Sequence, residues 1–339
     1  MINFIKPTDK LSIGGLMIFL YGEPGIGKTS VANTAGNCFL FDADNTGANR
    51  AINRQYITRL LDTELQKSIL PQGEFGLTID EFIIYLTSGS LIKDLEAGTG
   101  ERLDSLIIDN TDNFMNMILG YCARRNPSLI LKTGQYDNMR VYGEAKPVLK
   151  NIIKFLRLTG RNIINITHEK ADGGKENKRT GDKKATPNAA SSVLTEMGAA
   201  CDLIGRITAE RGGRWIDFSP SAEGFGKNPA NLPAMQIPDF DGPSNWFLDK
   251  IINPTREAMS APSISNEAVR KDIERFKAKI HNAQNASDVN GIISELIELK
   301  DSNAKAYSTV RPELKKRATE LSLVFNSTVG NYEDVQTAN

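Results

Sequence analysis

The chain has 339 residues, of which 40% are hydrophobic and 24% are charged, so it can form one large domain or two ordinary ones around a buried core. Its formal net charge is zero, and any contact with nucleic acid must therefore come from a local patch of positive charge. The three cysteines are scattered and only two histidines are present, which argues against a disulfide framework or a zinc site.

Free cysteines are typical of a reducing cytoplasm. The first ten residues, MINFIKPTDK, carry Lys6, Asp9 and Lys10 before any long apolar run, so they do not resemble a signal peptide. No stretch approaches the roughly 20 apolar residues that a membrane-spanning helix needs. We therefore expect a cytoplasmic protein without a membrane partner.

Short apolar segments in the first half of the chain predict buried strands. They span residues 16–21, 38–44, 104–112 and 160–169, and the second and third carry acids at their ends. A helix is predicted over residues 29–35. A second helix precedes Gly160 and has one apolar face formed by Val148, Ile152, Phe155 and Leu156. Strands that alternate with helices are typical of a parallel α/β sheet.

The middle of the chain changes character. Residues 170–192 lack apolar periodicity and are rich in Gly, Lys and Asn, so they predict a long mobile loop, and such loops are usually functional. The segments LIGRITAE and RWIDFSP predict two short strands that pair as a hairpin. Residues 224–244 are rich in Gly and Pro and predict a loop.

Composition shifts again near residue 262. Val269, Ile273, Phe276 and Ile280 recur at helical spacing, and Ser265 is placed to cap this helix. Further helices are predicted over residues 287–299 and over 312–325, the last with proline in its first turn. We interpret residues 1–255 as an α/β domain, 262–326 as a small helical domain and 327–339 as a disordered tail.

The segment GEPGIGKT, residues 22–29, fits the phosphate-binding pattern G-x-x-x-x-G-K-[ST] between a predicted strand and a predicted helix. Glycines allow backbone N–H groups to turn toward a triphosphate, and the following helix N-terminus favours an anion. Lys28 would reach the β- and γ-phosphates, and the Thr29 hydroxyl would bind magnesium. The predicted nucleotide-binding residues are Gly22, Glu23, Pro24, Gly25, Ile26, Gly27, Lys28, Thr29 and Ser30.

Acidic residues at the ends of two predicted strands are candidates for the chemistry. Asp109 closes the strand SLIID and is placed to hold magnesium, although an Asp in DNTDNF could instead cap a loop or helix. Asp44 ends a strand that we expect beside the phosphate-loop strand, where it could polarise the attacking water. Asp42 should point to the same face, so the alternation does not separate the two acids. We prefer Asp44 because it lies nearer the strand end, and a turn-forming acid is the alternative.

His168 follows the fourth predicted strand and precedes the loop of residues 170–192. It could sense the γ-phosphate, although a lone histidine is more often a structural hydrogen-bonding residue. The loop carries an excess of positive charge that could follow a nucleic-acid backbone. It has no aromatic side chain for base stacking, so a solvated charged loop is the alternative. The candidate DNA-binding cations are Lys175, Lys178, Arg179, Lys183 and Lys184.

The segments GEPGIGKTS, FLFDAD, LIIDNTD, YGEAKPVLKNIIKFLRLTGRNIINITHEK and GFGKNPANLP together resemble the phage-type RecA-core ATPases. These are compact relatives of RecA, and some act as single-strand annealing or recombination proteins. The resemblance covers roughly residues 15–240. It implies an α/β fold, namely a P-loop NTPase with a RecA-like, mostly parallel sheet flanked by helices, here followed by a small helical appendage.

The resemblance also implies residue roles. Lys28 and Thr29 match the phosphate and magnesium residues, and Asp109 matches the Walker B acid. Asp44 matches the catalytic glutamate but is one methylene shorter, and His168 matches the γ-phosphate-sensing glutamine. Residues 171–190 lie where RecA-like proteins have their second DNA-binding loop. Lys227, in GFGKNP, resembles the basic residue projected into a neighbour's ATP site.

The implied activity is Mg²⁺-dependent ATP hydrolysis, stimulated by single-stranded DNA, in phage recombination, repair or replication. If Lys227 acts in trans, ATP lies at a subunit interface and the chain forms a homo-oligomeric ring or filament. If a phage encodes the chain, the expected location is the cytoplasm of the host cell. The C-terminal helices, which do not look like the RecA C-terminal domain, could dock a single-strand-binding or other replication protein, or pack on a neighbouring subunit.

Other functions fit the same motifs. A helicase loader or protein-remodelling ATPase would hydrolyse ATP without stimulation by single-stranded DNA. A nucleotide-binding switch or assembly protein would barely hydrolyse it, and the short Asp44 side chain is compatible with that function. A small-molecule kinase is disfavoured, because such enzymes usually carry an arginine-rich lid and the chain shows no substrate-pocket motif.

Overall fold

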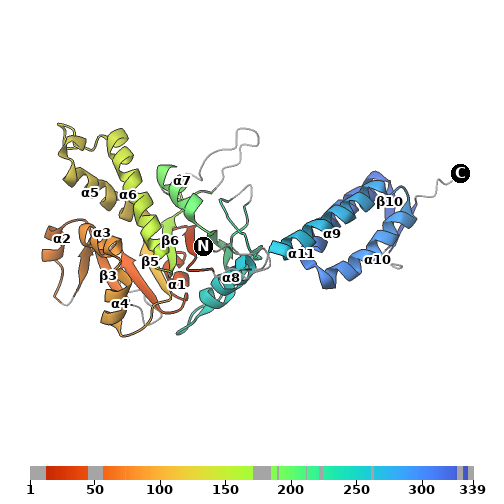
Figure 1. Cartoon of the computed structure of the whole chain (residues 1–339), viewed down its shortest axis with the longest axis horizontal. Helices are drawn as coiled ribbons and strands as arrows, with labels where there is room; N and C mark the ends of the chain where they lie inside the picture. The colour runs from red at the N-terminus through yellow and green to blue at the C-terminus, as the bar shows by residue number, and fades with distance from the viewer. Residues whose placement is uncertain are drawn as a thin grey trace, which may run out of the picture. The chain divides into compact units, whose positions relative to one another are not determined.

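The computed structural model describes residues 13–44, 56–72, 74–170, 185–188, 191–210, 212–220, 224–260, 263–326 and 331–334. The chain divides into two compact units between Met259 and Ser260. We call the larger one the core unit and the one that follows the C-terminal unit (Figure 1). The division falls inside the interval 255–262 that separates the two predicted domains.

The core unit is built on a nine-stranded sheet with the order β4-β3-β2-β5-β6-β1-β7-β8-β9. The strands from β4 to β7 in this order are parallel, and β8 and β9 are added antiparallel. Their bounds are β1 Met17–Gly22, β2 Cys38–Asp42, β3 Tyr56–Leu61, β4 Gly76–Thr78, β5 Ser105–Asp109, β6 Asn162–His168, β7 Leu203–Glu210, β8 Gly213–Asp217 and β9 Met235–Ile237.

Helices flank this sheet, which confirms the predicted α/β fold class (Figure 1). In the core unit they are α1 Lys28–Ala32, α2 Glu64–Ser68, α3 Ile79–Ser88, α4 Leu91–Thr99, α5 Thr111–Arg125, η2 Pro127–Leu129, α6 Asn138–Leu158, α7 Ser191–Ala200, η3 Leu248–Ile252 and α8 Asn253–Ser260. Across the described residues, no helix combines the length and the apolar character needed to cross a membrane.

Strand β1 shows how the sheet forms two cores. All of its residues are buried, and alternate side chains point to opposite faces. Phe19 and Tyr21 pack into the cluster formed with α3, α5, α6 and α7, whereas Ile18 and Leu20 pack into the cluster formed with α1 and η3. A strand buried on both faces needs a continuous apolar run, which is why LMIFLY was recognisable.

The four predicted strands are present, but their order differs from the expectation. We expected the strand ending near Asp44 to lie beside the phosphate-loop strand, and this is wrong, because β5 and β6 separate β2 from β1. Strand β2 also ends at Asp42. Strands β3 and β4 were not predicted, and β9 lies inside residues 224–244, where only a loop was expected. The β7–β8 hairpin is confirmed.

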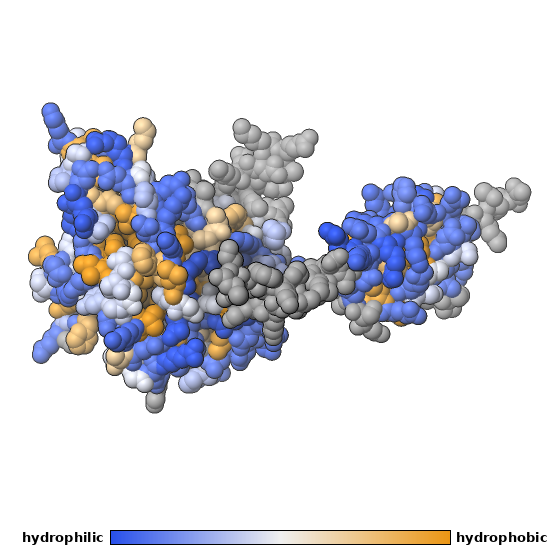
Figure 2. All heavy atoms as spheres, in the orientation of Figure 1, coloured by the Kyte–Doolittle hydropathy of each residue, from blue (hydrophilic) through white to orange (hydrophobic). Residues whose placement is uncertain are grey.

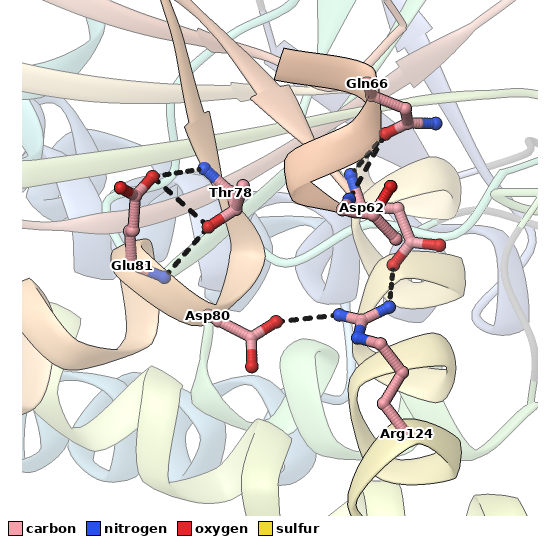
Figure 3. Close-up of polar contacts among 7 residues, drawn as sticks. Asp62, Gln66, Thr78, Asp80, Glu81 and Arg124 are labelled. Atoms are coloured by element: carbon pink, nitrogen blue, oxygen red, sulfur yellow. Dashed lines mark hydrogen bonds and ion pairs between the residues drawn. The ribbon is translucent and has the colours of Figure 1, made fainter. Parts of the chain in front are cut away.

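The edge of the sheet at β4 is held by a polar network (Figure 3). Arg124 of α5 donates to Asp62 at 2.6 Å and to Asp80 at 2.8 Å, bridging the end of β3 and the start of α3. Thr78 and Glu81 form a reciprocal capping box at the start of α3. These polar contacts hold α3 against β3 and α5 at this edge of the sheet, where the strands are too short to give a long apolar pattern in the sequence.

The C-terminal unit contains α9 Ser263–Asn282, α10 Ala286–Ser302, α11 Ala304–Glu320 and the hairpin β10 Leu323–Asn326 with β11 Asn331–Asp334. Its buried cluster is apolar and combines all three helices, with Phe276, Val289 and Val310 fully buried. A cavity of about 720 Å³ lies between α10, α11 and this hairpin. The predicted docking of a replication protein on these helices stays a prediction.

Three expectations for this unit are wrong in detail. Helix α9 starts at Ser263, so Ser265 lies inside it and not at its cap. Helix α11 starts well before Pro312, because the Asn303 side chain accepts the Ala306 N–H at 3.1 Å and caps the helix there. Residues 331–334 form a strand within the segment that we expected to be a disordered tail.

Candidate nucleotide-binding site

The loop between β1 and α1 adopts a conformation that depends on glycine. Gly25 and Gly27 have φ angles of 79° and 91°, a left-handed region that side chains with a Cβ rarely adopt. Gly27 is the residue immediately before α1. The GEPGIGKT segment therefore forms a tight turn from a buried strand into a helix, as the phosphate-binding pattern requires.

Lys28 folds back over this loop. Its Nζ donates to the carbonyl oxygens of Gly22 at 3.0 Å and Glu23 at 2.8 Å, and it lies 3.2 Å from Nδ1 of His168. The parallel register of β1 and β6 places Gly22 opposite His168, which explains how residues so distant in sequence meet. The cation and the imidazole thus stand together at the carboxyl edge of the sheet.

Thr29 and Asp109 are in direct contact. The Thr29 hydroxyl donates to Oδ2 of Asp109 at 2.5 Å. Burial raises the pKa of Asp109 above its ordinary value, the Thr29 hydrogen bond opposes that rise, and repulsion by Asp42 and Asp44 adds to it. The surroundings of Asp109 therefore stabilise its negative charge less well than water does.

The two acids at the end of β2 have different environments. Asp42 is buried and its Oδ1 accepts the backbone N–H of Asp44 at 3.1 Å. Asp44 lies two residues beyond the strand, and its Oδ1 accepts Nδ2 of Asn113 at 2.6 Å. The backbone carbonyl of Asp109 accepts the Asp44 N–H at 3.3 Å. Contacts with Asn113 of α5 and with the Asp109 carbonyl of β5 therefore orient Asp44, and the Asp42 carboxylate holds its backbone N–H.

The helix after β5 is capped by Asn110, not by Asp109. The Asn110 Oδ1 accepts the N–H of Asn113 at 2.8 Å, at the start of α5. The alternative in which Asp109 serves as the cap is therefore wrong. Its side chain is left to face Thr29.

Eight of the predicted site residues line one cavity of about 350 Å³, a volume typical of small-molecule sites, whereas Gly22, Glu23, Pro24 and Ile26 are not among its lining residues. Strands β2, β5 and β6 and the loop after β1 all contribute to it. The residues that line it are Gly25, Gly27, Lys28, Thr29, Ser30, Asp44, Asp109 and His168.

Lys227 is not among the lining residues of this cavity. It pairs with Ile204 of β7, and its Nζ donates to the carbonyl oxygens of Cys201 at 2.5 Å and Ala199 at 3.5 Å. A cation at the last carbonyls of α7 is favoured by the helix dipole. Within its own chain Lys227 therefore supports α7, and a role in a neighbour's site stays a prediction.

The candidate DNA-binding cations Lys175, Lys178, Arg179, Lys183 and Lys184 lie outside the described residues. The segment that follows them, residues 185–188, returns to the end of β6. There the N–H of Asn188 donates to the carbonyl of His168 at 2.6 Å, and the N–H of Lys170 donates to the carbonyl of Thr186 at 3.0 Å. The base of the predicted loop is thus joined by hydrogen bonds to a residue of the cavity.

Three groups near the cavity were not predicted. Asn113 orients Asp44; Asp112 accepts the Thr167 hydroxyl at 2.7 Å; and Arg214 of β8 approaches Gly27. Burial and the nearby Asp44 raise the pKa of Asp112, although its hydrogen bond from Thr167 opposes this. For Asp112 and Asn113 the sequence signal was the polar segment DNTDNF, which did not show which residue does what. For Arg214 there was no signal, because no sequence pattern links the phosphate-binding loop to a distant hairpin.

The residues present fit Mg²⁺. A hydroxyl and a carboxylate, both hard oxygen donors, face each other at the end of β5, and a cation there would neutralise the partly buried Asp109. Among the described residues, no group of three His, Cys, Asp or Glu side chains could hold a metal ion alone. Phosphate oxygens and water would complete the coordination.

The chain was compared with known protein families, curated proteins and solved structures. Residues 14–230 match the family model described as an AAA domain, which covers more than half of the chain. None of the curated proteins matches the chain. Among solved structures, a KaiC-like protein from the hyperthermophilic archaeon Pyrococcus horikoshii is similar at 13% identity and a TM-score of 0.32, covering 60% of this chain and 78% of the other.

Proposed function

Because the chain belongs to the family of AAA domains, we propose that it binds ATP with Mg²⁺ and hydrolyses the bond to the γ-phosphate. One observation carries the proposal, namely that the Thr29 hydroxyl lies 2.5 Å from the Asp109 carboxylate in the cavity that also contains Lys28. A hydroxyl and an acid at this point are what a magnesium–triphosphate complex requires.

The residues would divide the work as follows. Lys28 would leave the carbonyls of Gly22 and Glu23 to neutralise phosphate oxygens, and Thr29 with Asp109 would hold Mg²⁺. The ion would stabilise charge on the phosphate oxygens. Asp44, held by Asn113, would orient and polarise the attacking water. The water oxygen would bond to the γ-phosphorus while the bond from that phosphorus to the β,γ-bridging oxygen breaks, so that ADP and inorganic phosphate leave and the proton of the water passes through Asp44 to solvent.

We further propose that single-stranded DNA stimulates this hydrolysis, in phage recombination, repair or replication. The support is the hydrogen bonding between His168 and Asn188, which connects the cavity to the base of the segment that carries the basic residues. A change at the γ-phosphate that moves His168 would be passed to residues 186–188. The phosphate backbone of DNA is the partner that a lysine-rich segment fits.

We propose a homo-oligomer in which Lys227 reaches a neighbour's nucleotide. Figure 2 shows hydrophobic atoms among hydrophilic ones on the visible face of the core unit. Exposed apolar side chains that could take part in an interface lie in two stretches of this unit. They are Leu65, Ile69, Phe75, Ile84 and Tyr85, and Ile130, Leu131, Tyr136 and Met139. Lys227→Ala should reduce both ATPase activity and assembly measured by sedimentation, and unchanged values would exclude the trans role.

The main experiment measures ATP hydrolysis with and without single-stranded DNA at two salt concentrations, for the wild type and Lys28→Ala. We expect turnover that DNA stimulates, that salt weakens and that Lys28→Ala abolishes. Turnover without stimulation at any salt would favour a remodelling ATPase or helicase loader. ATP binding without turnover would favour a nucleotide-dependent switch.

A pair of matched variants tests the DNA contact itself. Changing the adjacent cations Lys183 and Lys184 to Ala should remove most of the stimulation and leave hydrolysis without DNA unchanged. The control changes another adjacent pair, Lys315 and Lys316 of α11, and should leave stimulation intact. Equal effects of both pairs would show that only net charge matters.

A further inference from the structure

Arg214 lies beside the phosphate-binding loop, on the side opposite to the acidic residues. It stands on β8, which pairs with β7, and β7 pairs with β1 on the edge away from β6. A Cβ atom built on Gly27 would lie only 2.3 Å from Nη1 of Arg214. The guanidinium therefore fills the space directly against the loop that would hold the phosphates.

Two acceptors just after β9 hold the other end of this guanidinium, away from Gly27. Nη2 of Arg214 donates to the carbonyl oxygen of Pro238 at 3.1 Å and to Oδ1 of Asp239 at 3.3 Å, just after β9. Asp239 is 93% exposed, so water screens its attraction for Arg214 and leaves most of the positive charge uncompensated. Among the described residues, Nη1 has no hydrogen-bond acceptor.

The two sides of the loop can be distinguished by their chemistry. Thr29, Asp109 and His168 gather on the β5 and β6 side, where magnesium and the γ-phosphate belong. Arg214 approaches Gly27 from the β7 and β8 side and lies outside the set of residues that line the cavity. A guanidinium has N–H donors in a fixed plane that suit phosphate oxygens.

We propose that Arg214 is a second phosphate-binding cation of the nucleotide site, contacting the α- or β-phosphate and not the γ-phosphate. This inference rests on the proposed function, since it needs a nucleotide in the loop. Arg214 would act within its own chain and would contribute to binding ATP and ADP alike. Asp239 positions it.

The test measures equilibrium binding of Mg-ATP and Mg-ADP, together with kcat, for the wild type, Arg214→Gln and Arg214→Lys. Arg214→Gln should weaken binding of both nucleotides by a similar factor, about 10- to 100-fold, because one charge-assisted contact is lost. Its kcat should change by less than about threefold. Arg214→Lys should recover part of the affinity, and Asp239→Asn should weaken it only severalfold.

Arg161→Gln is the matched control. Arg161 is similarly buried and pairs with Glu96 at 2.7 Å. It immediately precedes β6 at the amino end of that strand, whereas the cavity lies at the carboxyl ends of the parallel strands. This variant should bind both nucleotides as the wild type does. A thermal melt of each variant identifies any loss that comes from unfolding.

Three results would overturn the inference. Wild-type affinity in folded Arg214→Gln, while Lys28→Ala loses binding, would remove Arg214 from the site and leave the proposed function intact. Weaker binding of ATP but not ADP, with a large fall in kcat, would place Arg214 at the γ-phosphate. A wild-type protein that binds neither nucleotide would contradict the proposed function itself.

Discussion

The interiors of the two units differ in polarity. In the core unit the buried residues include Lys28 and Thr29 after the phosphate-binding loop, Asp42 at the end of β2, and Asn110 and Thr111 just after β5. From residue 263 onward, the described buried side chains are all apolar. Both units bury large aromatic side chains, so the difference is not in core packing.

This difference shows where the chain accepts a cost in stability. Burying a polar or charged group without full compensation is unfavourable, and the raised pKa of Asp109 indicates such a group. The described residues of the C-terminal unit include no comparable cluster of buried polar side chains, and its helices pack through apolar side chains. We therefore expect substitutions in the core unit's polar interior to change function more than stability, and the reverse in the C-terminal unit.

The largest expected effect is that of Asp109→Asn. It should lower Mg²⁺-dependent ATP hydrolysis by about 1,000-fold, or roughly 4 kcal/mol, because a carboxylate that holds the metal is lost. The same change should raise the melting temperature or leave it unchanged, since it removes a partly buried charge that Asp42 and Asp44 repel. Asp104→Asn, at the other end of β5, is the control and should retain activity; a lower melting temperature for Asp109→Asn would contradict the comparison.

Phe276→Ala should have the opposite profile. The ring is fully buried in the C-terminal cluster, so its removal should cost about 3 kcal/mol of unfolding free energy for that unit. Nucleotide affinity should not change, because the cluster contains only C-terminal residues. Phe325→Ala, at a ring that is 52% exposed, should cost much less. Denaturant unfolding and nucleotide titration check both statements.

Asp44→Asn and Asp42→Asn distinguish the roles of the acid that ends β2, Asp42, and the acid two residues beyond it, Asp44. Asp44→Asn should lower kcat by about 100-fold with little change in affinity, because Asp44 lines the cavity and would position water. Asp42→Asn should act mainly on stability, since its side chain holds the backbone of Asp44. A larger fall in kcat for Asp42→Asn would assign the catalytic role to Asp42.

The smallest effect concerns pH. The folded protein binds a proton at Asp109 more readily than the unfolded chain, so the contribution of this group to stability is present at low pH and is lost as pH rises through the raised pKa. Magnesium needs the ionised form, so Mg-ATP affinity should fall as pH drops through the same range, by up to about tenfold per unit. Asp109→Asn should remove the dependence of affinity and reduce that of stability, since Asp112 also has a raised pKa; nucleotide titration and thermal melts measure the two.

The sequence by itself determined the elements that carry a strong local signal. The runs LMIFLY and SLIID predicted buried strands because they are apolar on both faces, and GEPGIGKT predicted the tight turn because only glycine adopts its backbone angles freely. The helices after residue 262 were recognisable from their apolar spacing, although the caps were misplaced because Asn303 acts at a distance from Pro312.

Tertiary structure decided what those elements build. Strand order is set by pairing between distant segments, so no local pattern could show that β5 and β6 separate β2 from β1. Nor could it show that Asn113 orients Asp44, that Lys227 supports α7 or that Arg214 reaches Gly27 from a hairpin. Local chemistry identified the residues that would hold a nucleotide, and the register of the sheet determined which of them share one cavity.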